Sequence, residues 1–310
     1  MALQIHQLTY FVAVARTRHF TQAAELSGVS QPSLSKQVRV LENTLGARLF
    51  DRVRGAVTLT AAGEALLPLA QRILIDVEAA QRAVAEVSDM RRGLLRLGGT
   101  PSLCAGLLAG ALARFHAEYP GIDLQVREGG SRDLVDALHR GELDLALMID
   151  SPRGADPDLS LTPLLRESLL LASPADAPPP TDQPRMPVSD LRGRPLVMFR
   201  EGYDLRERTR AACLAAGFEP TLAIEGGEMD AVLQFVEAGI GLAVVPSMVL
   251  RTRPTLRGTP LEHPRLERTV ALAHRREASL PASAAAFQTV LALHLTTWGA
   301  DELGDDLRLL

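Results

Sequence analysis

The chain has 310 residues, 46% of them hydrophobic and 4% aromatic, which is the composition of a globular protein long enough for two domains. No stretch reaches the roughly 18 uncharged apolar residues of a membrane span, and the N-terminus does not resemble a secretion signal, so we expect a cytoplasmic protein without a membrane partner. A net charge of −4 is unpromising for a nucleic-acid binder until it is divided by position.

The two parts of the chain carry charge of opposite sign. Residues 1–60 hold seven arginine and lysine residues against three carboxylates, a net charge of +4. Residues 61–310 hold 26 basic and 34 acidic residues, a net charge of −8. A basic N-terminal module joined to an acidic body would direct a polyanion to one end of the molecule.

Three short helices are predicted in this basic module. Four apolar residues with the spacing of one helix face place the first helix at residues 5–16: Leu8, Phe11, Val12 and Ala15. Thr21 is expected to cap the second helix, and Gly28 supplies the tight reversal after it. Ser30 is the expected N-cap of the third helix, whose buried stripe consists of Leu34, Val38 and Leu41. This order predicts a helix-turn-helix.

The exposed side of the third helix is predicted to read DNA. It carries short hydrogen-bonding groups and cations: Gln31, Ser33, Ser35, Lys36 and Arg39. Gln31 could contact adenine through its amide, Lys36 a guanine or a phosphate, and Arg39 the phosphate backbone. The alternative is that Gln31 and the serines only cap the helix and that the cations form a solvated face.

Residues 47–60 predict a β-wing beside this helix. The run ARLFDRVRGAVTLT is typical of two short strands that turn near Arg54 and Gly55. Arg52 and Arg54 would then face the phosphate backbone. Residues 1–60 are therefore expected to form a winged helix-turn-helix domain, an all-α module apart from its wing.

Residues 8–52 closely resemble the signature segment of LysR-type transcriptional regulators. The resemblance rests on the SQPSLSKQ stretch, the LE-x-x-LG-x-x-LF-x-R stretch and the T-x-x-G sequence that opens the next helix. It implies sequence-specific binding to double-stranded DNA, with the positions of Gln31, Pro32, Ser35 and Lys36 at the interface. The full set of expected DNA-contacting residues is Thr21, Gln31, Pro32, Ser33, Ser35, Lys36, Arg39, Arg52 and Arg54.

A long linker helix is predicted within residues 61–92, capped by Thr60 and bent rather than broken by Pro68. Its apolar residues alternate in steps of four and three, the spacing of a coiled-coil seam: Leu66, Ala70, Ile73, Val77, Ala80, Val84 and Val87. We expect this seam to form a homodimer with a second copy of the chain, as the resemblance also implies. The alternative is an amphipathic helix lying on its own body.

From residue 93 to residue 310, short apolar runs alternate with helical stretches, a pattern that predicts an α/β domain around a mainly parallel sheet. A Pro-rich loop separates two sets of strands and helices. We therefore expect two lobes joined by two crossings, one lobe formed by residues 93–165 and 266–300 and the other by residues 166–265. This body resembles the effector-binding domain of LysR-type regulators, which is similar to periplasmic binding proteins, and VEAGIGLAVVP is typical of the family.

Four loops at the carboxyl ends of the strands are expected to form an effector site, because helix N-termini there favour anions. The expected effector-binding residues are Thr100, Pro101, Ser102, Ser131, Met148, Phe199, Arg200, Tyr203, Gly227 and Met229. Hydroxyls, free N–H groups and Arg200 could hold a carboxylate, and the apolar members could cover an aromatic or other apolar portion. The alternative is that the serines only cap helices and that Arg200 pairs with Glu201 or Glu225.

Other function classes lack their motifs. The chain has no phosphate-binding Gly-Lys-Ser/Thr sequence, no G-x-S-x-G elbow and no His cluster with metal-ligand spacing, so we expect neither an enzyme nor a metal or cofactor site. A ligand-binding protein without a role on DNA would leave the basic module and the heptad seam unexplained. Thiol redox sensing is a further alternative for the signal input, because Cys104 lies in the first turn of a helix whose dipole could lower its pKa.

These patterns together predict a transcriptional regulator. A small organic effector would favour one closure of the two lobes and so change the spacing or angle of the DNA-binding heads in the oligomer. The family resemblance further implies a tetramer assembled from two dimers and contact with RNA polymerase.

Overall fold

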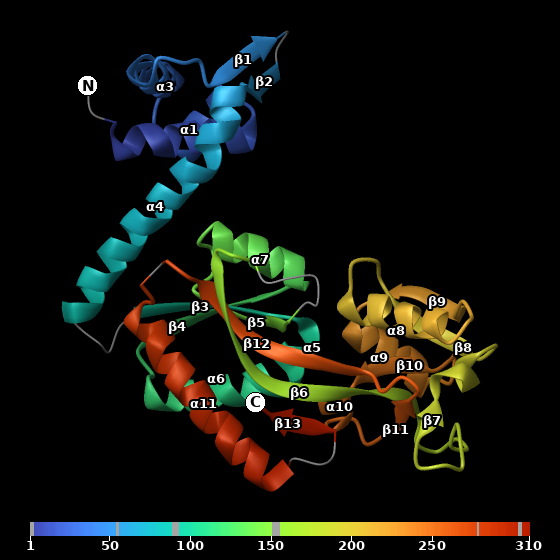
Figure 1. Cartoon of the computed structure of the whole chain (residues 1–310). Helices are drawn as coiled ribbons and strands as arrows, with labels where there is room; N and C mark the ends of the chain where they lie inside the picture. The colour runs from blue at the N-terminus through green and yellow to red at the C-terminus, as the bar shows by residue number, and fades with distance from the viewer. Residues whose placement is uncertain (1–2, 54–55, 89–92, 151–155, 278, 303–305) are drawn as a thin grey trace. The chain divides into compact units, whose positions relative to one another are not determined.

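The computed structural model describes residues 3–53, 56–88, 93–150, 156–277, 279–302 and 306–310. Contacts within the chain divide it into two compact units. The first consists of residues 1–85 with 139–141, and the second of residues 86–138 with 142–310. The helix-turn-helix and most of the long linker helix therefore belong to one unit, and the α/β body forms the other (Figure 1).

Three helices form the head, the name used here for residues 3–59. They are α1 (Ile5–Thr17), α2 (Phe20–Leu26) and α3 (Gln31–Leu45). The predicted apolar stripes meet in one core, in which Leu8, Phe11, Leu34, Val38 and Leu41 are buried. Val12 and Ala15, the other two residues predicted for the first stripe, are half-buried and pack against this core. Helical periodicity was sufficient to place α1 and α3 because each has one continuous apolar face.

The start of α2 differs from the prediction. His19 is the N-cap, with extended backbone dihedrals, and its ring accepts a hydrogen bond from Gln22 N at 3.5 Å. Thr21 lies inside the first turn with an exposed side chain, so the prediction that Thr21 caps this helix is wrong. The helix starts earlier because Phe20 is buried in the head core. Gly28 does supply the reversal after α2, at φ +66°.

The predicted wing is present as two antiparallel strands, β1 (Phe50–Val53) and β2 (Ala56–Leu59). Residues 54–55, where the turn was predicted, lie outside the described residues. The carboxylate of Glu42 on α3 accepts hydrogen bonds from the backbone N–H groups of Leu49, at 2.9 Å, and Phe50, at 3.4 Å. The wing is thereby held to the third helix.

The linker helix α4 (Ala61–Ser88) begins as predicted. The Thr60 hydroxyl accepts a hydrogen bond from Gly63 N at 3.1 Å and donates one to Arg48 O at 2.6 Å. A Cβ on Gly63 would lie only 2.2 Å from the carbonyl oxygen of Leu49, so the first turn of α4 packs directly on the chain that enters the wing. Ala70 is also fully buried in the head core. The start of α4 is therefore a fixed part of the head.

The first lobe of the body contains the parallel strands β4 (Ile122–Glu128), β3 (Gly93–Gly99) and β5 (Leu145–Ile149), paired in that order. The helical segment after β3 consists of α5 (Pro101–Leu103), a π turn (Cys104–Leu108) and α6 (Ala109–Glu118). The helix α7 (Ser131–His139) follows β4, and α11 (Ala282–Glu302) packs on α6 and β3. Every residue of β5 is buried. Both faces of the sheet are therefore covered at β5, whereas most of the edge strand β4 is exposed.

The second lobe repeats the alternation of strands and helices. Its strands β8 (Pro195–Phe199) and β9 (Thr221–Gly227) pair in parallel, and β10 (Ala243–Pro246) follows them in the chain. The helices α8 (Asp204–Ala215) and α9 (Met229–Glu237) pack on β8 and β10. The shorter elements are β7 (Met186–Pro187), a 3₁₀ helix (Val188–Leu191) and α10 (Ser247–Leu250).

Two long antiparallel strands, β6 (Leu159–Pro174) and β12 (Glu267–Arg275), run between the lobes (Figure 1). The strand β12 pairs with β5, whereas β6 continues to β10 and β11 (Leu256–Glu262), and β13 (Leu307–Leu309) adds to β6; all these pairs are antiparallel. The predicted mainly parallel sheet is therefore wrong, and the sheet is mixed. The prediction rested on the alternation of strands and helices. That alternation does not indicate β6, the strand with which β10, β11, β12 and β13 all pair antiparallel.

A buried ion pair lies where the crossing strands meet. Glu167 on β6 and Arg268 on β12 are directly opposite in the register, their side chains are 0% and 2% exposed, and Arg268 Nε donates to Glu167 Oε2 at 2.8 Å. The second carboxylate oxygen accepts from Met248 N at 2.9 Å, and Arg268 also donates to Ser102 Oγ at 2.9 Å. The ion pair thus joins β6, β12, α5 and α10.

We predict that Arg268→Met lowers the free energy of unfolding of the body by about 3 to 5 kcal/mol, because it leaves the buried Glu167 carboxylate without its counter-charge. The double variant Glu167→Leu/Arg268→Met should lose clearly less than the sum of the two single variants. Urea unfolding of the full chain measures both. Arg210→Met, which breaks the exposed pair with Glu219, is the control and should cost less than about 1 kcal/mol. Equal losses for Arg268→Met and Arg210→Met would contradict this account.

Candidate DNA interface and effector site

The third helix presents the predicted polar face outward. Gln31, Pro32, Ser33, Lys36 and Arg39 are exposed and Ser35 is half-buried, whereas the apolar stripe of the same helix is buried in the head core. The amide Nε2 of Gln31 donates to Ser35 Oγ at 2.9 Å. Two of the proposed base-reading side chains are therefore held together before any DNA is bound.

A polar contact that periodicity did not predict fixes the third helix against the first. Gln7 is almost fully buried within the apolar face of α1, and its Nε2 donates to Gln37 Oε1 on α3 at 3.2 Å. His6 Nε2 lies 3.2 Å from the same oxygen. A glutamine inside an apolar helical stripe was the available signal, since a buried amide needs a partner. Gln7 and His6 thus help to orient α3.

The wing arginines are only partly covered by the structure. Arg52 belongs to β1, but the position of its side chain is not among the described features, and Arg54 lies outside the described residues. Their contact with the phosphate backbone stays a prediction.

The heptad seam of α4 falls into two parts. Ala70 is fully buried in the head core, so its side chain is not available to a second copy and its predicted place in the seam is wrong, whereas Leu66 packs on that core and stays half-buried. Ile73 is 41% exposed, Val77 is half-buried and Ala80 is exposed. Nothing is described for the side chains of Val84 and Val87. Leu69, which the heptad count missed, is 57% exposed beside this part of the helix.

The four predicted effector loops do lie at carboxyl ends of strands. Thr100 follows β3, Ser131 begins α7 after β4, and Gly227 ends β9. Backbone bonds join the loops in pairs, with Gly129 N donating to Gly99 O and Arg200 N to Gly227 O, each at 3.2 Å. Pro101 occupies the first turn of the helical segment after Thr100.

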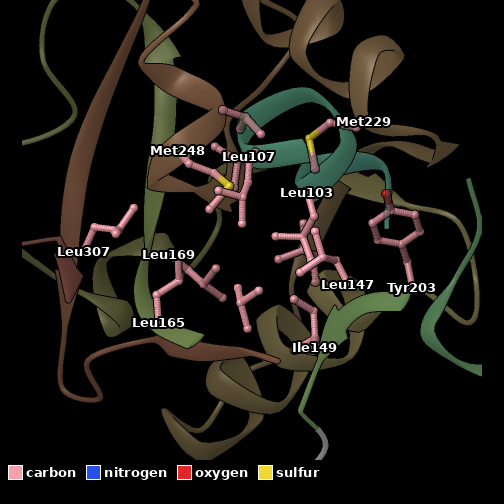
Figure 2. Close-up of a cluster of buried hydrophobic side chains, with 14 of the residues drawn as sticks. Leu103, Leu107, Leu147, Ile149, Leu165, Leu169, Tyr203, Met229, Met248 and Leu307 are labelled. Atoms are coloured by element: carbon pink, nitrogen blue, oxygen red, sulfur yellow. The ribbon is translucent and has the colours of Figure 1, made fainter. Parts of the chain in front are cut away.

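Side chains of the second lobe contribute an aromatic pair. The rings of Phe199 and Tyr203 are stacked with their centroids 5.0 Å apart and both residues are buried. Figure 2 shows Tyr203 and Met229 in one buried cluster with Leu103 and Leu147 of the first lobe. Residues of both lobes thus meet at these loops.

Met148 is not part of this cluster. Alternate residues of β5 face opposite sides of the sheet: Leu147 and Ile149 join the cluster of Figure 2, while Met148 packs with Leu134 and Leu138 of α7. The prediction that Met148 covers an apolar portion of the effector together with Tyr203 is therefore wrong. A strand buried on both faces has no polar alternation from which its facing could be deduced.

Arg200 is paired, but with a partner that neither alternative named. Its Nε donates to the carboxylate of Glu228, and its Nη1 donates to the carbonyl oxygen of Glu201 at 3.3 Å, while Glu225 pairs with Arg206. The bond to Glu228 raises the pKa of Arg200 above its ordinary value. Arg200 Cζ also lies 5.6 Å from the centroid of the Tyr203 ring.

Two hydroxyls of the site are buried without a hydrogen-bond partner. Among the described residues these atoms are Thr100 Oγ1 and the phenolic oxygen of Tyr203. Thr100 is the N-cap of α5, yet its side chain makes no capping bond. Burial, followed by the charge of Glu228, raises the pKa of Tyr203 above its ordinary value, so the phenol stays protonated and can donate a hydrogen bond.

The cysteines do not have the properties of reactive thiols. Burial and the nearby carboxylate of Glu128 raise the pKa of Cys104 to about 11, which is opposite to the lowering predicted from the helix dipole. Burial also raises the pKa of Cys213, which is fully buried on α8. Within the described part of the chain, no group of histidine, cysteine and carboxylate residues could hold a metal ion. The same part contains no helix long and apolar enough to cross a bilayer.

Comparison with known families matches both units. Residues 5–64 match the model for the bacterial regulatory helix-turn-helix protein of the lysR family, and residues 88–295 match the model for the LysR substrate binding domain. The chain belongs to the LysR family of transcriptional regulators. It is therefore a DNA-binding regulator with an effector-binding domain, in a family of regulators and not of enzymes, as the sequence predicted.

Relatives support this over nearly the whole length. The transcriptional dual regulator GltC of Bacillus subtilis is 31% identical over 284 residues, which cover 91% of this chain and 94% of GltC. The hydrogen peroxide-inducible genes activator of Dickeya chrysanthemi is 30% identical over 276 residues, covering 88% of this chain and 90% of the activator. The crystal structure of full-length CbnR with its target DNA has the same fold, with a TM-score of 0.65 at 24% identity, covering 94% of this chain and 100% of CbnR.

We predict that Cys104 reacts slowly with iodoacetamide at pH 7 and about tenfold faster for each unit of pH up to pH 10, because only the thiolate is nucleophilic and the pKa of about 11 keeps its fraction small. Glu128→Gln should raise the rate at pH 7 by removing the carboxylate that disfavours the thiolate. Mass spectrometry of the Cys213→Ser variant isolates the reaction at Cys104. A rate that levels off below pH 9 would contradict the raised pKa.

Proposed function

We propose that this regulator binds a specific operator in the cytoplasm as a homodimer or as a tetramer assembled from two dimers, and that a small organic effector held by the loops of the body changes the geometry of its DNA-binding heads. The observation that carries the proposal is the outward face of α3, where Gln31, Lys36 and Arg39 are exposed above a buried apolar stripe. Contact with RNA polymerase would link the bound regulator to transcription.

The chemistry of α3 suits sequence-specific binding. An amide can form two hydrogen bonds to adenine in the major groove, and a lysine can reach guanine or a phosphate. The bond between Gln31 and Ser35 restricts the amide before binding, which lowers the entropy that ordering it would cost. Lys36 and Arg39 supply cations that attract the backbone without regard to sequence. Pro32 and Ser33 would contact the DNA at the first turn, with Thr21 on α2 and Arg52 and Arg54 on the wing adding contacts nearby.

Effector control would act through the crossing strands. Both lobes share β6 and β12, so a ligand that touches residues of each lobe can favour one arrangement of the two. In each copy of the chain, α4 directly precedes the body in sequence, and the first turns of α4 pack in the head core. A change of lobe closure would then alter the angle between two heads in a dimer.

We predict that Gln31→Ala and Ser35→Ala each weaken binding to the operator by about 1 to 3 kcal/mol and leave binding to unrelated DNA nearly unchanged. Lys36→Ala should weaken both and reduce the slope of log affinity against log salt by about one. Fluorescence anisotropy with DNA upstream of the gene and its neighbours, across a salt series, measures these effects. Gln125→Ala, an exposed glutamine of the body, is the matched control.

Equal loss on operator and unrelated DNA for Gln31→Ala would remove it as a base reader. If the full chain shows no preference for any upstream DNA, the proposal of a specific operator fails, and a ligand-binding role without DNA recognition gains support.

We predict that Ile73→Asp and Leu69→Asp shift the chain from dimer to monomer, because each would bury a charge in the proposed helix pair. Analytical ultracentrifugation of the full chain measures the shift. Leu26→Asp is the matched control, since Leu26 is 76% exposed on the head and lies outside the seam. A dimer that persists in both α4 variants would place the interface elsewhere.

A further inference from the structure

The effector site contains two hydrogen-bonding groups that the chain itself does not satisfy. Thr100 and Tyr203 are each only 6% exposed, and their hydroxyls have no partner among the described residues. Thr100 follows β3 in the first lobe and Tyr203 precedes α8 in the second. Buried hydroxyls nearly always have partners in folded proteins, so two unsatisfied ones, one on an effector loop of each lobe, point to a polar ligand or water at these loops.

The arginine side chains of this site already form ion pairs with carboxylates of the chain. Arg268, which bonds to Ser102, is paired with the buried carboxylate of Glu167. Arg200, which lies over the Tyr203 ring, is paired with Glu228 and lies within electrostatic reach of Asp133 on α7. A carboxylate ligand that bonds to either guanidinium would share it with a carboxylate of the chain, which reduces the counter-charge that the ligand meets.

Carboxylates outnumber cations around the same loops. Glu128, at the end of β4, acts electrostatically on both Cys104 in the first lobe and Tyr203 in the second. Glu128 is exposed, and within the described part of the chain no cation is bonded to it. The carboxylates at these loops are Glu128, Asp133, Glu167, Glu225 and Glu228, whereas the arginines that bond there among the described residues are Arg200, Arg206 and Arg268. The resulting field disfavours an anion and favours a cation.

The helix N-terminus after β3 offers little to offset this field. Pro101 has no N–H group, and the N–H groups of Leu103 and Cys104 both donate to the carbonyl oxygen of Thr100, each at 2.9 Å. Only the N–H of Ser102 remains in the first turn. A carboxylate would therefore find few of the donors that make helix N-termini anion sites.

We propose that the effector of this regulator is a neutral or positively charged polar molecule, held by the hydroxyls of Thr100 and Tyr203 and by the carboxylates of Glu128 and Glu228, and not a simple carboxylate. The inference rests on the proposed function, since it specifies the ligand class of the same site. It replaces the expectation of a carboxylate that the loops alone had suggested.

Three probes of similar size and shape but different charge test the ligand class: benzoate, benzamide and benzamidine. Isothermal titration calorimetry with the full chain should give affinities for benzamide and benzamidine at least about tenfold higher than for benzoate. Operator binding is measured on the same preparation by anisotropy. The charge inference and the proposed function can then fail separately.

Two kinds of variant locate the probe at the proposed site. Thr100→Val and Tyr203→Phe, which remove one hydroxyl each with little change of shape, should weaken benzamide binding several-fold, whereas the matched control Tyr119→Phe should not. Glu128→Gln should reduce the preference for benzamidine over benzoate, whereas Glu219→Gln, an exposed glutamate of the other lobe, should leave it unchanged.

Benzoate that binds as tightly as benzamide, with an affinity that falls in Thr100→Val, would overturn the inference while leaving an effector site in place. Absence of binding for all three probes, or binding that neither hydroxyl variant weakens, would also overturn it. Retained operator binding in these cases would show that the DNA-binding role stands independently.

Discussion

The buried carboxylate of Glu167 is the constraint on which the arrangement of the body depends. Removing such a charge from water costs on the order of several kcal/mol unless partners compensate it. Arg268 and the N–H of Met248 do so, and Arg268 extends the network to Ser102. The crossing strands β6 and β12, the helix α10 and the segment α5 that carries Ser102 therefore share a single electrostatic centre. A shift of any one of them affects the others.

The head was the more predictable part because most of its structure depends on local spacing. The stripe of Leu34, Val38 and Leu41 follows from helical periodicity alone, and so does the polar face opposite. The bond from Gln7 to Gln37 could not be predicted in this way, since it joins residues 30 positions apart. The cap of α2 was misplaced for a related reason. The burial of Phe20, a tertiary contact, outweighed the capping preference of Thr21.

In the body, alternation of strands and helices located the loops but not the chemistry between them. Thr100 and Tyr203 follow strands as expected, because βα units place their loops at one edge of a sheet. The partner of Arg200 proved to be Glu228, 28 positions away, and this pairing changes the charge that a ligand would meet. Composition and spacing do not report such long-range compensation. The same limit applies to Cys104, whose pKa is set by burial and Glu128 and not by its place in a helix.

The fixed start of α4 has a mechanical consequence. Gly63 packs against Leu49 and Ala70 lies in the head core, so the helix and the head move as one rigid lever. At 1.5 Å per residue, the 28 residues of α4 span about 42 Å. A tilt of about 5° at one end then displaces the other by about 4 Å, comparable with the spacing of about 3.4 Å between successive bases on a strand. Under the proposed effector control, small rotations of this lever would be converted into steps of DNA register.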